Sequence, residues 1–416
     1  MKPVRVGLLG LGTVGAGTHQ VLLRNAEEIT RRAGRDILVT CAAVRNLERP
    51  NPTGLRLCND PQQVVEDPEV EVVVELLGGY EPARSLVLQA IHNGKHVVTA
   101  NKAMIAVHGN EIFAAAHRAG VMVAFEAAVS GGIPIIKALR EGLAGNRIEW
   151  LAGIINGTGN FIMTEMRDKG REFAEVLAEA QALGYAEADP TFDVEGIDAA
   201  HKLTILASIA FGIPLQFNKV YTEGISHITR EDVAYAEELG YRIKHLGMAR
   251  KVSDGIELRV HPTLVPYRRL IANVEGVMNA VLVKGDAVGP TLYYGAGAGA
   301  EPTASAVVAD IIDVVRTLTV DPHNRVPHLA FQSDCLSDDP ILPMDDVETA
   351  YYLRIKVEDR TGVLADITRI LADNRINIEA IIQREEGPGE TLATVIILTH
   401  RIREGQVNAA IETIEA

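Results

Sequence analysis

Acidic side chains crowd around one lysine in the segment GYAEADPTFDVEGIDAAHKL, which runs from Gly184 to Leu203. If a helix begins near Glu195, Asp198 and Lys202 are four residues apart and lie on one face of it. The apolar stretch LTILASIAFGIPL overlaps this segment, so we expect a mostly buried helix, and burial lowers the pKa of a lysine toward neutrality. Such a lysine can act as a general acid or base, beside carboxylates that bind a substrate ammonium group. The acidic residues of the segment are Glu187, Asp189, Asp193, Glu195 and Asp198.

Two other interpretations of this segment stay open. The charges could form a solvated face of ion pairs on a surface helix. They could also bind a divalent metal, although the spacing is not that of an EF-hand loop and Lys202 would repel the ion. We expect Glu187, Asp189 and Asp193 in a loop before the helix, interrupted by Pro190.

A glycine pattern near the N-terminus predicts a dinucleotide-binding loop. The strand-like segment PVRVGLL precedes it and the helical segment AGTHQVLLRNAEEI follows it. Glycines at this spacing let the backbone approach a pyrophosphate at a helix N-terminus, whereas a turn that serves only packing is the alternative. The predicted cofactor-binding residues of the loop are Gly10, Leu11, Gly12, Thr13, Val14 and Gly15.

The end of the next predicted strand, DILVTCAAV, bears on the choice of cofactor. An acidic residue there would bind the ribose of NAD, whereas an arginine favours the 2′-phosphate of NADP. This chain has Arg45 and no acid until Glu48. We therefore expect NADP, with NAD still possible, and a solvated loop arginine is the alternative for Arg45.

Three further strands, EVEVVVELLGG, KHVVTANKAMI and VMVAFEAAV, alternate with helical patterns. This alternation predicts an α/β fold with a parallel, doubly wound sheet of the Rossmann type. Ligands bind outside the carboxyl ends of such strands. The rule places Gly78 and Lys102 at the cofactor edge, together with the segment Phe125 to Gly132; a plain surface lysine is the alternative for Lys102.

The pattern changes from Ser130 onward and predicts an α+β substrate domain with an open sheet. The strand-like RIEWLAGII leads into NGTGN, which opens a helix; helical stretches follow, and IELRVHPTLVP and GVMNAVLVKGDAVGPTLYYGAG supply more strands. A second glycine-rich turn, GAGAGAEPTASAVV, precedes another helix. We expect this helix to return to the first domain, with its N-terminus near the nicotinamide; a simple helix entry is the alternative.

The segment from Ala180 to Lys202 resembles the motif of homoserine dehydrogenases, A-x3-GYA-x2-DP-x2-DV-x-G-x-D-x3-K. The resemblance continues through GLGTVG, ELLGG, TANKA, FEAAVSGGIPII, NGTGNF and GAGAGAEPTASAVV. One departure is Gly159, where the family pattern NGTTN has threonine, although Asn156 and Thr158 are in place.

The resemblance implies NAD(P)H-dependent interconversion of L-aspartate 4-semialdehyde and L-homoserine, in threonine, methionine and isoleucine biosynthesis. It also implies that Lys202 donates the proton to the carbonyl oxygen during hydride transfer, and that Lys102 is a second essential lysine near nicotinamide and substrate. The implied catalytic residues are Lys202, Lys102, Asp198 and Asp193. The implied substrate-binding residues are Glu187, Asp198, Lys102, Asn156 and Thr158. The resemblance adds Gly297 and Glu301 to the cofactor site, and a sodium ion on the backbone carbonyls of Glu126, Val129, Gly131 and Ile133.

A C-terminal module follows the Pro- and Asp-rich linker. Strand, helix, strand, the turn GPGE (387–390), strand and helix succeed one another, which is the ferredoxin-like order. The stretch VEDRTGVLADI resembles an ACT domain, with Gly362 at the turn where such domains bind amino acids. This implies feedback inhibition by threonine, and a module that only dimerises is the alternative. The printed sequence stops after the second helix, so we expect the last strand to be missing and one sheet edge to be open.

The 416 residues are 47% hydrophobic and carry a net charge of −15, without a long basic cluster, which argues against nucleic acid as a partner. No apolar stretch is long enough for a transmembrane helix. Cys41, Cys58 and Cys335 have no CxxC spacing, which suits a cytoplasmic protein without disulfides. We expect a homodimer or homotetramer, because ACT domains usually pair. The expected divisions are 1–130 for the nucleotide-binding domain, joined by 300–325; 131–299 for the substrate domain; 326–348 for the linker; and 349–416 for the ACT domain.

Three other functions stay open. One is another dehydrogenase of amino-acid metabolism, against which the segment from Asp193 to Lys202 argues. Aspartate-semialdehyde dehydrogenase is a second, but it needs a catalytic cysteine and none is suitably placed. The third is a sensor without catalytic activity that binds NADP and an amino acid, against which the pair Lys102 and Lys202 argues.

Overall fold

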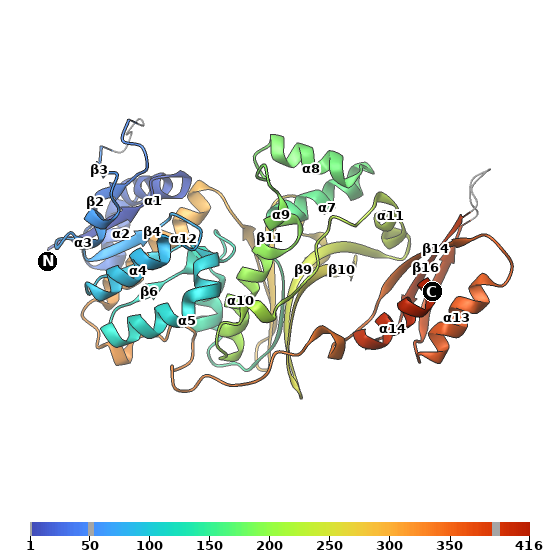
Figure 1. Ribbon diagram of the computed structural model, residues 1–416. Helices are drawn as coiled ribbons and strands as arrows, with labels where there is room; N and C mark the ends of the chain where they lie inside the picture. Colours follow the sequence, from blue (N-terminus) through green and yellow to red (C-terminus); the bar gives the residue numbers. More distant parts are fainter. Residues whose placement is uncertain (1, 49–53, 385–391) are drawn as a thin grey trace.

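The computed structural model describes residues 2–48, 54–384 and 392–416. Three α/β units follow one another in a row, from the N-terminal unit through a mixed sheet to the C-terminal module (Figure 1). The predicted GPGE turn lies outside the described residues. None of the described helices combines the length and the apolar character needed to cross a bilayer.

The N-terminal unit is built on a parallel sheet, as predicted. Its strand order among the described residues is β3-β2-β1-β4-β5-β6, the order of a Rossmann fold. The edge strand β3 was not predicted, because it is only three residues long and has no apolar run. The strands are β1 (Val4–Leu9), β2 (Ile37–Ala43), β3 (Arg56–Cys58), β4 (Val72–Glu75), β5 (His96–Thr99) and β6 (Val123–Ala124).

Helices cover both faces of this sheet. On one face α1, α2 and α12 share a hydrophobic core with the side chains of Val4, Val6 and Leu8. The core on the other face includes α3, α4 and α5. Although α12 is distant in sequence, it packs against α1 and α2. These helices are α1 (Thr13–Arg24), α2 (Ala26–Ala33), α3 (Gln62–Glu66), α4 (Ala83–His92), α5 (Lys102–Ala119) and α12 (Ala300–Thr317).

The middle unit is a mixed sheet with the order β12-β11-β7-β9-β10-β8. The strand β9 is absent from the predicted strands, because its polar residues break a clear alternation. It forms nevertheless, since it pairs with β10 from Tyr241↔Pro266 to Val252↔Gly255 and with β7 on its other side. The strands are β7 (Ile148–Ile154), β8 (Tyr221–Thr222), β9 (Tyr241–Val252), β10 (Gly255–Pro266), β11 (Met278–Gly285) and β12 (Gly289–Ala296).

The helices of the middle unit carry most of the motif residues. They are α6 (Ile135–Lys137), which continues as a π-helix over Ala138–Gly142, α7 (Gly157–Lys169), α8 (Phe173–Ala182), α9 (Thr191–Val194), α10 (Ile197–Phe211) and α11 (Arg230–Glu238). Short 3-10 helices lie at Glu126–Ala128, Phe217–Lys219, Leu270–Asn273, Pro322–Asn324 and Met344–Asp346.

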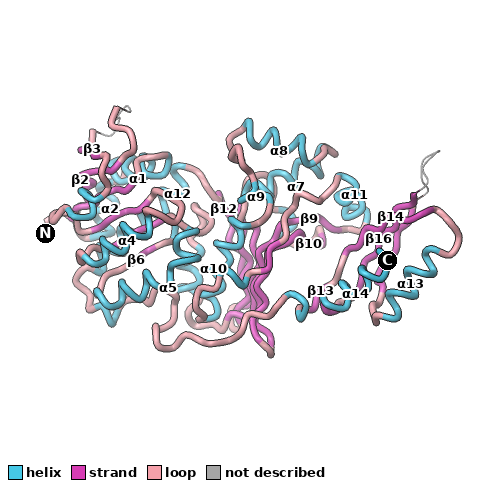
Figure 2. The backbone as a smooth tube through the Cα atoms, in the orientation of Figure 1, coloured by secondary structure: helices cyan, strands magenta, loops and turns pink. Residues whose placement is uncertain are grey.

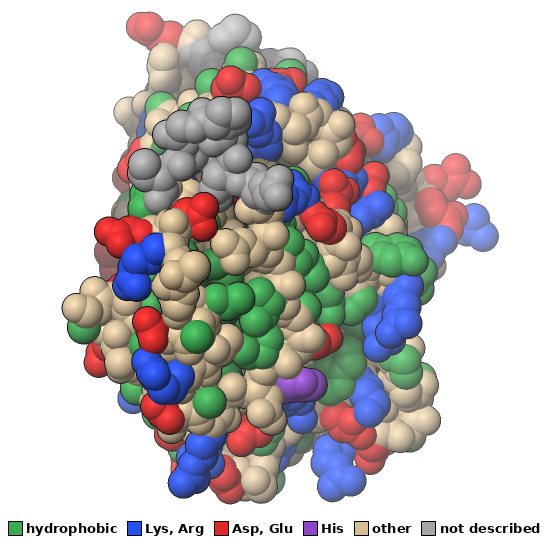
Figure 3. Space-filling model, turned by 90° about the vertical axis from the view of Figure 1, so that its right-hand side faces the viewer, with side chains coloured by type: hydrophobic (Ala, Val, Ile, Leu, Met, Phe, Trp, Pro, Cys, Tyr) green, Lys and Arg blue, Asp and Glu red, His purple; other side chains and the backbone are tan. Residues whose placement is uncertain are grey.

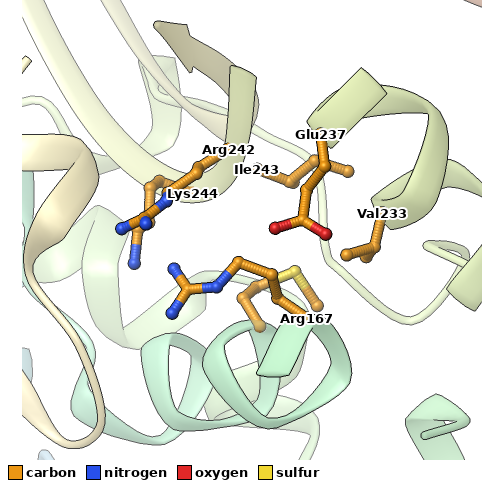
Figure 4. A pocket seen from close by; sticks show the side chains of 7 residues that line it. Arg167, Val233, Glu237, Arg242, Ile243 and Lys244 are labelled. Carbon is orange, nitrogen blue, oxygen red and sulfur yellow. The ribbon is translucent and has the colours of Figure 1, made fainter. Parts of the chain in front are cut away.

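A buried lysine ties α7 to β9. The ammonium group of Lys244 donates to Oδ1 of Asn160 at 3.1 Å and to the carbonyl of Val274 at 2.6 Å. Figure 4 shows Lys244 and Arg242 on one side of a small cavity and Arg167 on another; its volume of about 10 Å³ is room for one water. Burial, helped by the charge of Arg167, lowers the pKa of Lys244 to about 8.

The C-terminal module has the predicted order of elements. Its sheet has the order β14-β16-β15, so β14 is an edge strand within the part of the chain that the structure describes. The preceding linker runs beneath the mixed sheet (Figure 2) and bridges Ile341 to Ile256 of β10. The elements are β14 (Tyr352–Glu358), α13 (Val363–Asp373), β15 (Ile378–Gln383), β16 (Leu392–Thr399) and α14 (Glu404–Glu415), with a small ladder of β13 (Glu348–Thr349) and β17 (Ile402–Arg403).

One carboxylate joins the module to the middle unit. Oδ2 of Asp232 accepts hydrogen bonds from the backbone N–H and the hydroxyl of Thr229 and so caps α11. Oδ1 accepts from the hydroxyl of Tyr352 at 2.8 Å and from Nε of Arg354 at 2.7 Å, both on β14. Because Asp232 is buried, these bonds fix the module against α11.

We predict that stability rises with pH because of Lys244. The pKa of a lysine in an unfolded chain is about 10.4, so the unfolded state binds more protons than the folded state between the two pKa values. The free energy of unfolding should therefore increase by about 2 kcal/mol from pH 7 to about pH 9.5 relative to the variant Lys244→Met. Urea unfolding of both proteins at both pH values measures this. Parallel pH dependence of the two proteins would contradict the depressed pKa.

Candidate active site

Two lysines and one aspartate meet where the N-terminal and middle units touch. The ammonium of Lys202 lies 2.7 Å from Oδ2 of Asp198, one turn earlier on α10. The ammonium of Lys102, from the first turn of α5, lies 2.9 Å from Oδ1 of the same carboxylate. Lys202 also donates to the carbonyl of Ile155 at 2.7 Å. Asp198 therefore bridges two lysines that come from different units.

Local sequence explains why these side chains start where they do. Asn101 caps α5, its side chain accepting from the N–H of Met104, so Lys102 stands at the first helical position after β5. Gly196, with φ of +80°, turns the chain into α10, which is buried from Asp198 to Phe211. The expected buried helix with Asp198 and Lys202 on one face is confirmed. The expectation of a loop at Asp193 is wrong, because Asp193 lies in the one-turn helix α9.

The electrostatics distinguish the two lysines. Burial lowers the pKa of Lys202, and the charge of Lys102 adds to this while Asp198 opposes it. The charge of Asp198 raises the pKa of Lys102 against the effect of burial. Burial alone would raise the pKa of Asp198, but the ammonium groups of Lys202 and Lys102 hold it well below its usual range. Of the two lysines, Lys202 thus releases its proton more readily.

Asn156 orders the two carboxylates. Its Nδ2 donates to Oδ1 of Asp193 at 2.8 Å and to Oδ2 of Asp198 at 2.9 Å. Its Oδ1 accepts from the N–H of Gly159 and caps α7. A Cβ at position 159 would lie 3.3 Å from this oxygen, so the departure from the NGTTN pattern relieves a tight contact at the cap. Burial raises the pKa of Asp193, against the hydrogen bond from Asn156.

Thr158 and Glu187 make no hydrogen bond to the Asp198 carboxylate that bridges the two lysines, among the residues that the structure describes. The hydroxyl of Thr158 donates to the carbonyl of Tyr185 at 2.6 Å and so holds the loop that carries Glu187. The side chain of Glu187 is exposed, yet its charge contributes to the raised pKa of Lys102. Glu187 therefore lies close enough to Lys102 for its charge to act there, while its side chain is accessible to solvent.

Sequence reasoning missed an aromatic cluster beside Lys202. The hydroxyl of Tyr80, in the loop between β4 and α4, lies 3.3 Å from Nε2 of His201. The His201 ring is fully buried and stacks on Phe217, with ring centroids 4.2 Å apart, and on Phe192 next to Asp193. Burial lowers the pKa of His201 to about 4, so the ring is neutral near pH 7. The only sequence signal was the position of His201 next to Lys202.

The cofactor edge has the shape that the glycine pattern predicts. A Cβ at Gly15 would lie 2.3 Å from the carbonyl oxygen of Gly10, so this turn excludes larger residues. Gly12 lies at the N-cap position of α1, and no atom of the described residues lies within 4 Å of a Cβ built there. The N–H groups of the first turn of α1 are therefore open to a pyrophosphate, and the site fits a dinucleotide. Leu11, Thr13 and Val14 lie in the same turn.

A buried carboxylate joins the neighbouring strand ends at this edge. Oε1 of Glu75 accepts from the N–H groups of Leu77 and Gly78, and Oε2 accepts from the hydroxyl of Thr99. Gly78, with φ of +75°, lies just beyond the carboxyl end of β4, and the carbonyl oxygen of Leu76 in the same segment would lie 3.0 Å from a Cβ at Gly10. Arg45 follows β2 with an exposed side chain, two residues after Ala43, whose carbonyl accepts from the N–H of Gly10.

The second glycine-rich turn holds Gly297 and Glu301, the two other residues expected at the cofactor site. The carbonyl oxygen of Gly297 would lie 2.8 Å from a Cβ at Gly131, so Gly297 borders the junction of the two units. The carboxylate of Glu301 pairs with Arg24 at 2.7 Å, at the last residue of α1, while the carbonyl oxygen of the preceding Ala300 would lie 2.9 Å from a Cβ at Gly17. The cofactor contact expected of Glu301 stays a prediction.

The residues expected to hold sodium form one short loop. Glu126 accepts from the N–H groups of Ile136 and Lys137, so its carboxylate serves to cap α6. The backbone carbonyl of Glu126 accepts from the N–H of Val129 at 3.4 Å. The backbone carbonyl of Ile133 accepts from the N–H of Ile135 at 2.8 Å. Gly131 lies between them with φ of +30°. Each carbonyl keeps a second lone pair, so these backbone oxygens could coordinate a hard cation such as sodium. Among the described residues, no group of three or more His, Cys, Asp or Glu side chains could hold a metal ion.

Comparison with known proteins gives matches along nearly the whole chain. Sequence profiles described as "Homoserine dehydrogenase, NAD binding domain", "Homoserine dehydrogenase" and "ACT domain" match residues 10–126, 134–312 and 351–416. The chain is 68% identical to the homoserine dehydrogenase of Pseudomonas aeruginosa and 58% identical to that of Neisseria gonorrhoeae. Both alignments cover all of this chain and 96% of the relative.

Solved structures agree with these matches. The crystal structure of a homoserine dehydrogenase from Thiobacillus denitrificans has a TM-score of 0.96 and 71% sequence identity, and the match covers 100% of this chain and 95% of that chain. A hyperthermophilic archaeal homoserine dehydrogenase in complex with NADPH has a TM-score of 0.65 at 26% identity, with 76% and 98% of the two chains covered.

We predict that Asp198→Asn lowers the pKa of both bridged lysines, because the carboxylate charge raises both. The expected decrease is about 1 to 3 pH units for each. A side-chain NMR titration of lysine-labelled protein measures it. Asp193→Asn is the matched control and should produce a smaller decrease, since Asp193 contributes less to either pKa. Equal effects of the two variants would refute the central place of Asp198.

Proposed function

The chain belongs to the homoserine dehydrogenase family, and from this premise we propose which of its residues perform the reaction. It is an oxidoreductase of amino-acid biosynthesis, which interconverts L-aspartate 4-semialdehyde and L-homoserine with a nicotinamide cofactor. The bound cofactor supplies or accepts the hydride at the carbon of the aldehyde.

Lys202 is the proton donor in this proposal. As the aldehyde is reduced, Lys202 gives a proton to the carbonyl oxygen, and the nitrogen keeps the electron pair of the broken N–H bond. Its lowered pKa favours this release. Asp198 and the carbonyl of Ile155 orient the ammonium group. Lys102 keeps its proton, because its pKa is raised, and stabilises the negative charge that develops on the oxygen.

The carboxylates bind the amino group and hydroxyl of the substrate. Glu187 reaches the site from its exposed loop, and Asp198 offers the oxygens between the two lysines. Asp193 supports Asp198 through the shared amide of Asn156. Thr158 keeps the Glu187 loop in place. This arrangement suits a small substrate that carries both an ammonium group and a carbonyl.

The cofactor in this proposal is NADP. The open first turn of α1 receives the pyrophosphate, and Arg45 would pair with the 2′-phosphate because it is exposed next to the glycine loop. The archaeal relative in complex with NADPH supports this choice. Gly78, Lys102 and Gly297 would border the nicotinamide. The backbone carbonyls of Glu126, Val129, Gly131 and Ile133 would hold a sodium ion that stiffens the loop between the two units.

The observation that carries the proposal is the double ion pair of Asp198 with Lys102 and Lys202. We predict that the wild type oxidises NADPH with aspartate semialdehyde, faster than it oxidises NADH. Lys202→Met should lower kcat by about 100- to 10,000-fold, because the general acid is lost, while NADPH still binds. Lys284→Met, which removes a partly exposed lysine on β11 that pairs with Glu149, should leave kcat unchanged. An active Lys202→Met variant would exclude Lys202 as the proton donor. A wild-type protein that oxidises neither cofactor would favour the alternative of a sensor without catalytic activity.

The ACT domain binds an amino-acid effector in this proposal, and threonine, an end product of the pathway, is the expected one. Asp232 provides the route to the active site. It caps α11, which packs against α7, and α7 begins next to Asn156. The guanidinium of Arg384 adds a second contact, because it lies 4.6 Å above the ring of Tyr235 on the same helix.

We predict that the double variant Tyr352→Phe with Arg354→Gln still binds threonine but loses inhibition by at least about tenfold, since two hydrogen bonds to Asp232 are removed. Calorimetry measures binding, and the NADPH assay measures inhibition. Arg369→Gln, an exposed arginine of α13, is the control and should behave as wild type. If threonine does not inhibit the wild-type enzyme, threonine is not its effector. A double variant that is inhibited normally would reject only the route through Asp232.

Hydrophobic side chains gather in the middle of the end face formed by the C-terminal module (Figure 3). We infer from this that the protein forms a homodimer or a homotetramer. Exposed large hydrophobic residues of this module are Leu364, Ile381 and Leu392. The cytoplasm is the expected compartment, since Cys41, Cys58 and Cys335 are free thiols that a reducing environment keeps stable.

A further inference from the structure

A large cavity lies at the far end of α5 from Lys102. Its volume is about 850 Å³, and it is open to solvent on one side and bounded by α5 from Asn110 onward, the chain that leads into β6, Pro214 and the linker segment 322–336. Cavities of this size hold small organic ligands. We propose that this cavity is a binding site for a small amphipathic anion, with an apolar body and one carboxylate or sulfonate group.

The charge of the lining indicates an anion. The chain has 55 acidic and 40 basic residues, yet none of the described residues that line the cavity is acidic. Arg118 and Arg325 contribute positive charge, and His117 and His323 lie beside them with ring centroids 6.4 Å apart. A basic, acid-free lining in an acidic protein makes the local potential favourable for a negative ligand.

Arg325 is the anchor of the cationic side. Its guanidinium donates to the backbone carbonyls of Gly120 at 2.8 Å and Val320 at 3.1 Å, and its buried Nε has no hydrogen-bond partner. Among the described residues Arg325 forms no ion pair with a carboxylate; the charge of Asp321 acts on it from nearby, but the Asp321 carboxylate accepts from the N–H of His323. The guanidinium is thus fixed in place, and an anion could pair with it at little cost in side-chain entropy.

Another part of the cavity lining is apolar. The ring of Phe113 stacks on His328 with centroids 5.0 Å apart, and burial lowers the pKa of His328 to about 3, so this ring stays neutral. Phe331 is partly exposed and packs over Gly212. A bare inorganic anion would leave these rings in water, and an uncharged apolar molecule would leave Arg325 unpaired. A ligand with both an apolar body and an anionic group satisfies both parts of the lining.

The cavity is separate from the active site. The 18 residues of α5 begin with Lys102 at the Asp198 bridge and end with Ala119 at the cavity, a distance of about 27 Å along the helix. Asn110, which also lines the cavity, holds α5 against the middle unit through the backbone N–H and carbonyl of Leu215. Ligands at the two ends therefore do not compete for the same residues.

Binding of 8-anilinonaphthalene-1-sulfonate, which is an apolar anion, tests the proposal by its fluorescence. The full-length protein is saturated with both NAD⁺ and NADP⁺, so that the probe cannot report the cofactor site. We expect one saturable site per chain in the wild type. Arg118→Gln and Arg325→Gln should each weaken binding by about tenfold. Ala114→Trp, which places a large ring from an exposed helix position into the cavity, should abolish it.

Two controls make the result specific. Arg147→Gln removes an exposed arginine far from the cavity and should leave binding unchanged. N-phenyl-1-naphthylamine, which has similar rings without the sulfonate, should bind at least about tenfold more weakly than the anion. Wild-type affinity in Ala114→Trp and Arg118→Gln would overturn the proposal, whether or not Arg325→Gln folds. Equal affinity for the uncharged probe would also overturn the proposal. So would a change of oligomeric state in Ala114→Trp, because the cavity would then be a contact between subunits.

Discussion

The buried carboxylate of Asp198 is the interaction on which the site depends. A buried charge is costly unless it is paired, and two ammonium groups close together repel each other. Asp198 removes both costs, because it lies between Lys102 and Lys202 at hydrogen-bond distance from each. Since the two lysines come from different units, this charge balance forms only when the units meet. Contact between the two units therefore also brings the proposed catalytic groups together.

Buried carboxylates that bind two segments at once also lie at other junctions of the chain. Asp232 caps α11 and accepts two hydrogen bonds from β14, which ties the C-terminal module to the middle unit. Glu126 accepts from the first N–H groups of α6, and its own N–H donates to Asp310 of α12 at 2.7 Å. Burial beside Glu126 raises the pKa of Asp310 to about 7. Shared carboxylates thus define how the units are oriented.

Backbone pairing supplies the rigidity behind these contacts. The long ladder of β9 with β10 carries Lys244, whose bond to Asn160 holds α7 against the sheet. The first residue before α7, Asn156, can then direct its amide at two carboxylates at once. One helix cap therefore performs a structural and a chemical task, and its position follows from contacts more than eighty residues away in the chain.

Local patterns in the sequence determined the elements and part of the site. The glycine spacing predicts the loop at Gly10, alternation predicts the parallel sheet, and spacing of four residues places Asp198 and Lys202 on one helix face. Contacts between distant segments were decided only by the tertiary structure: β9 as a strand, Glu301 paired with Arg24, and the cavity at the end of α5. The physical reason is that helix and strand periods are set by neighbours in the chain, whereas ion pairs, strand partners and cavities depend on which surfaces meet.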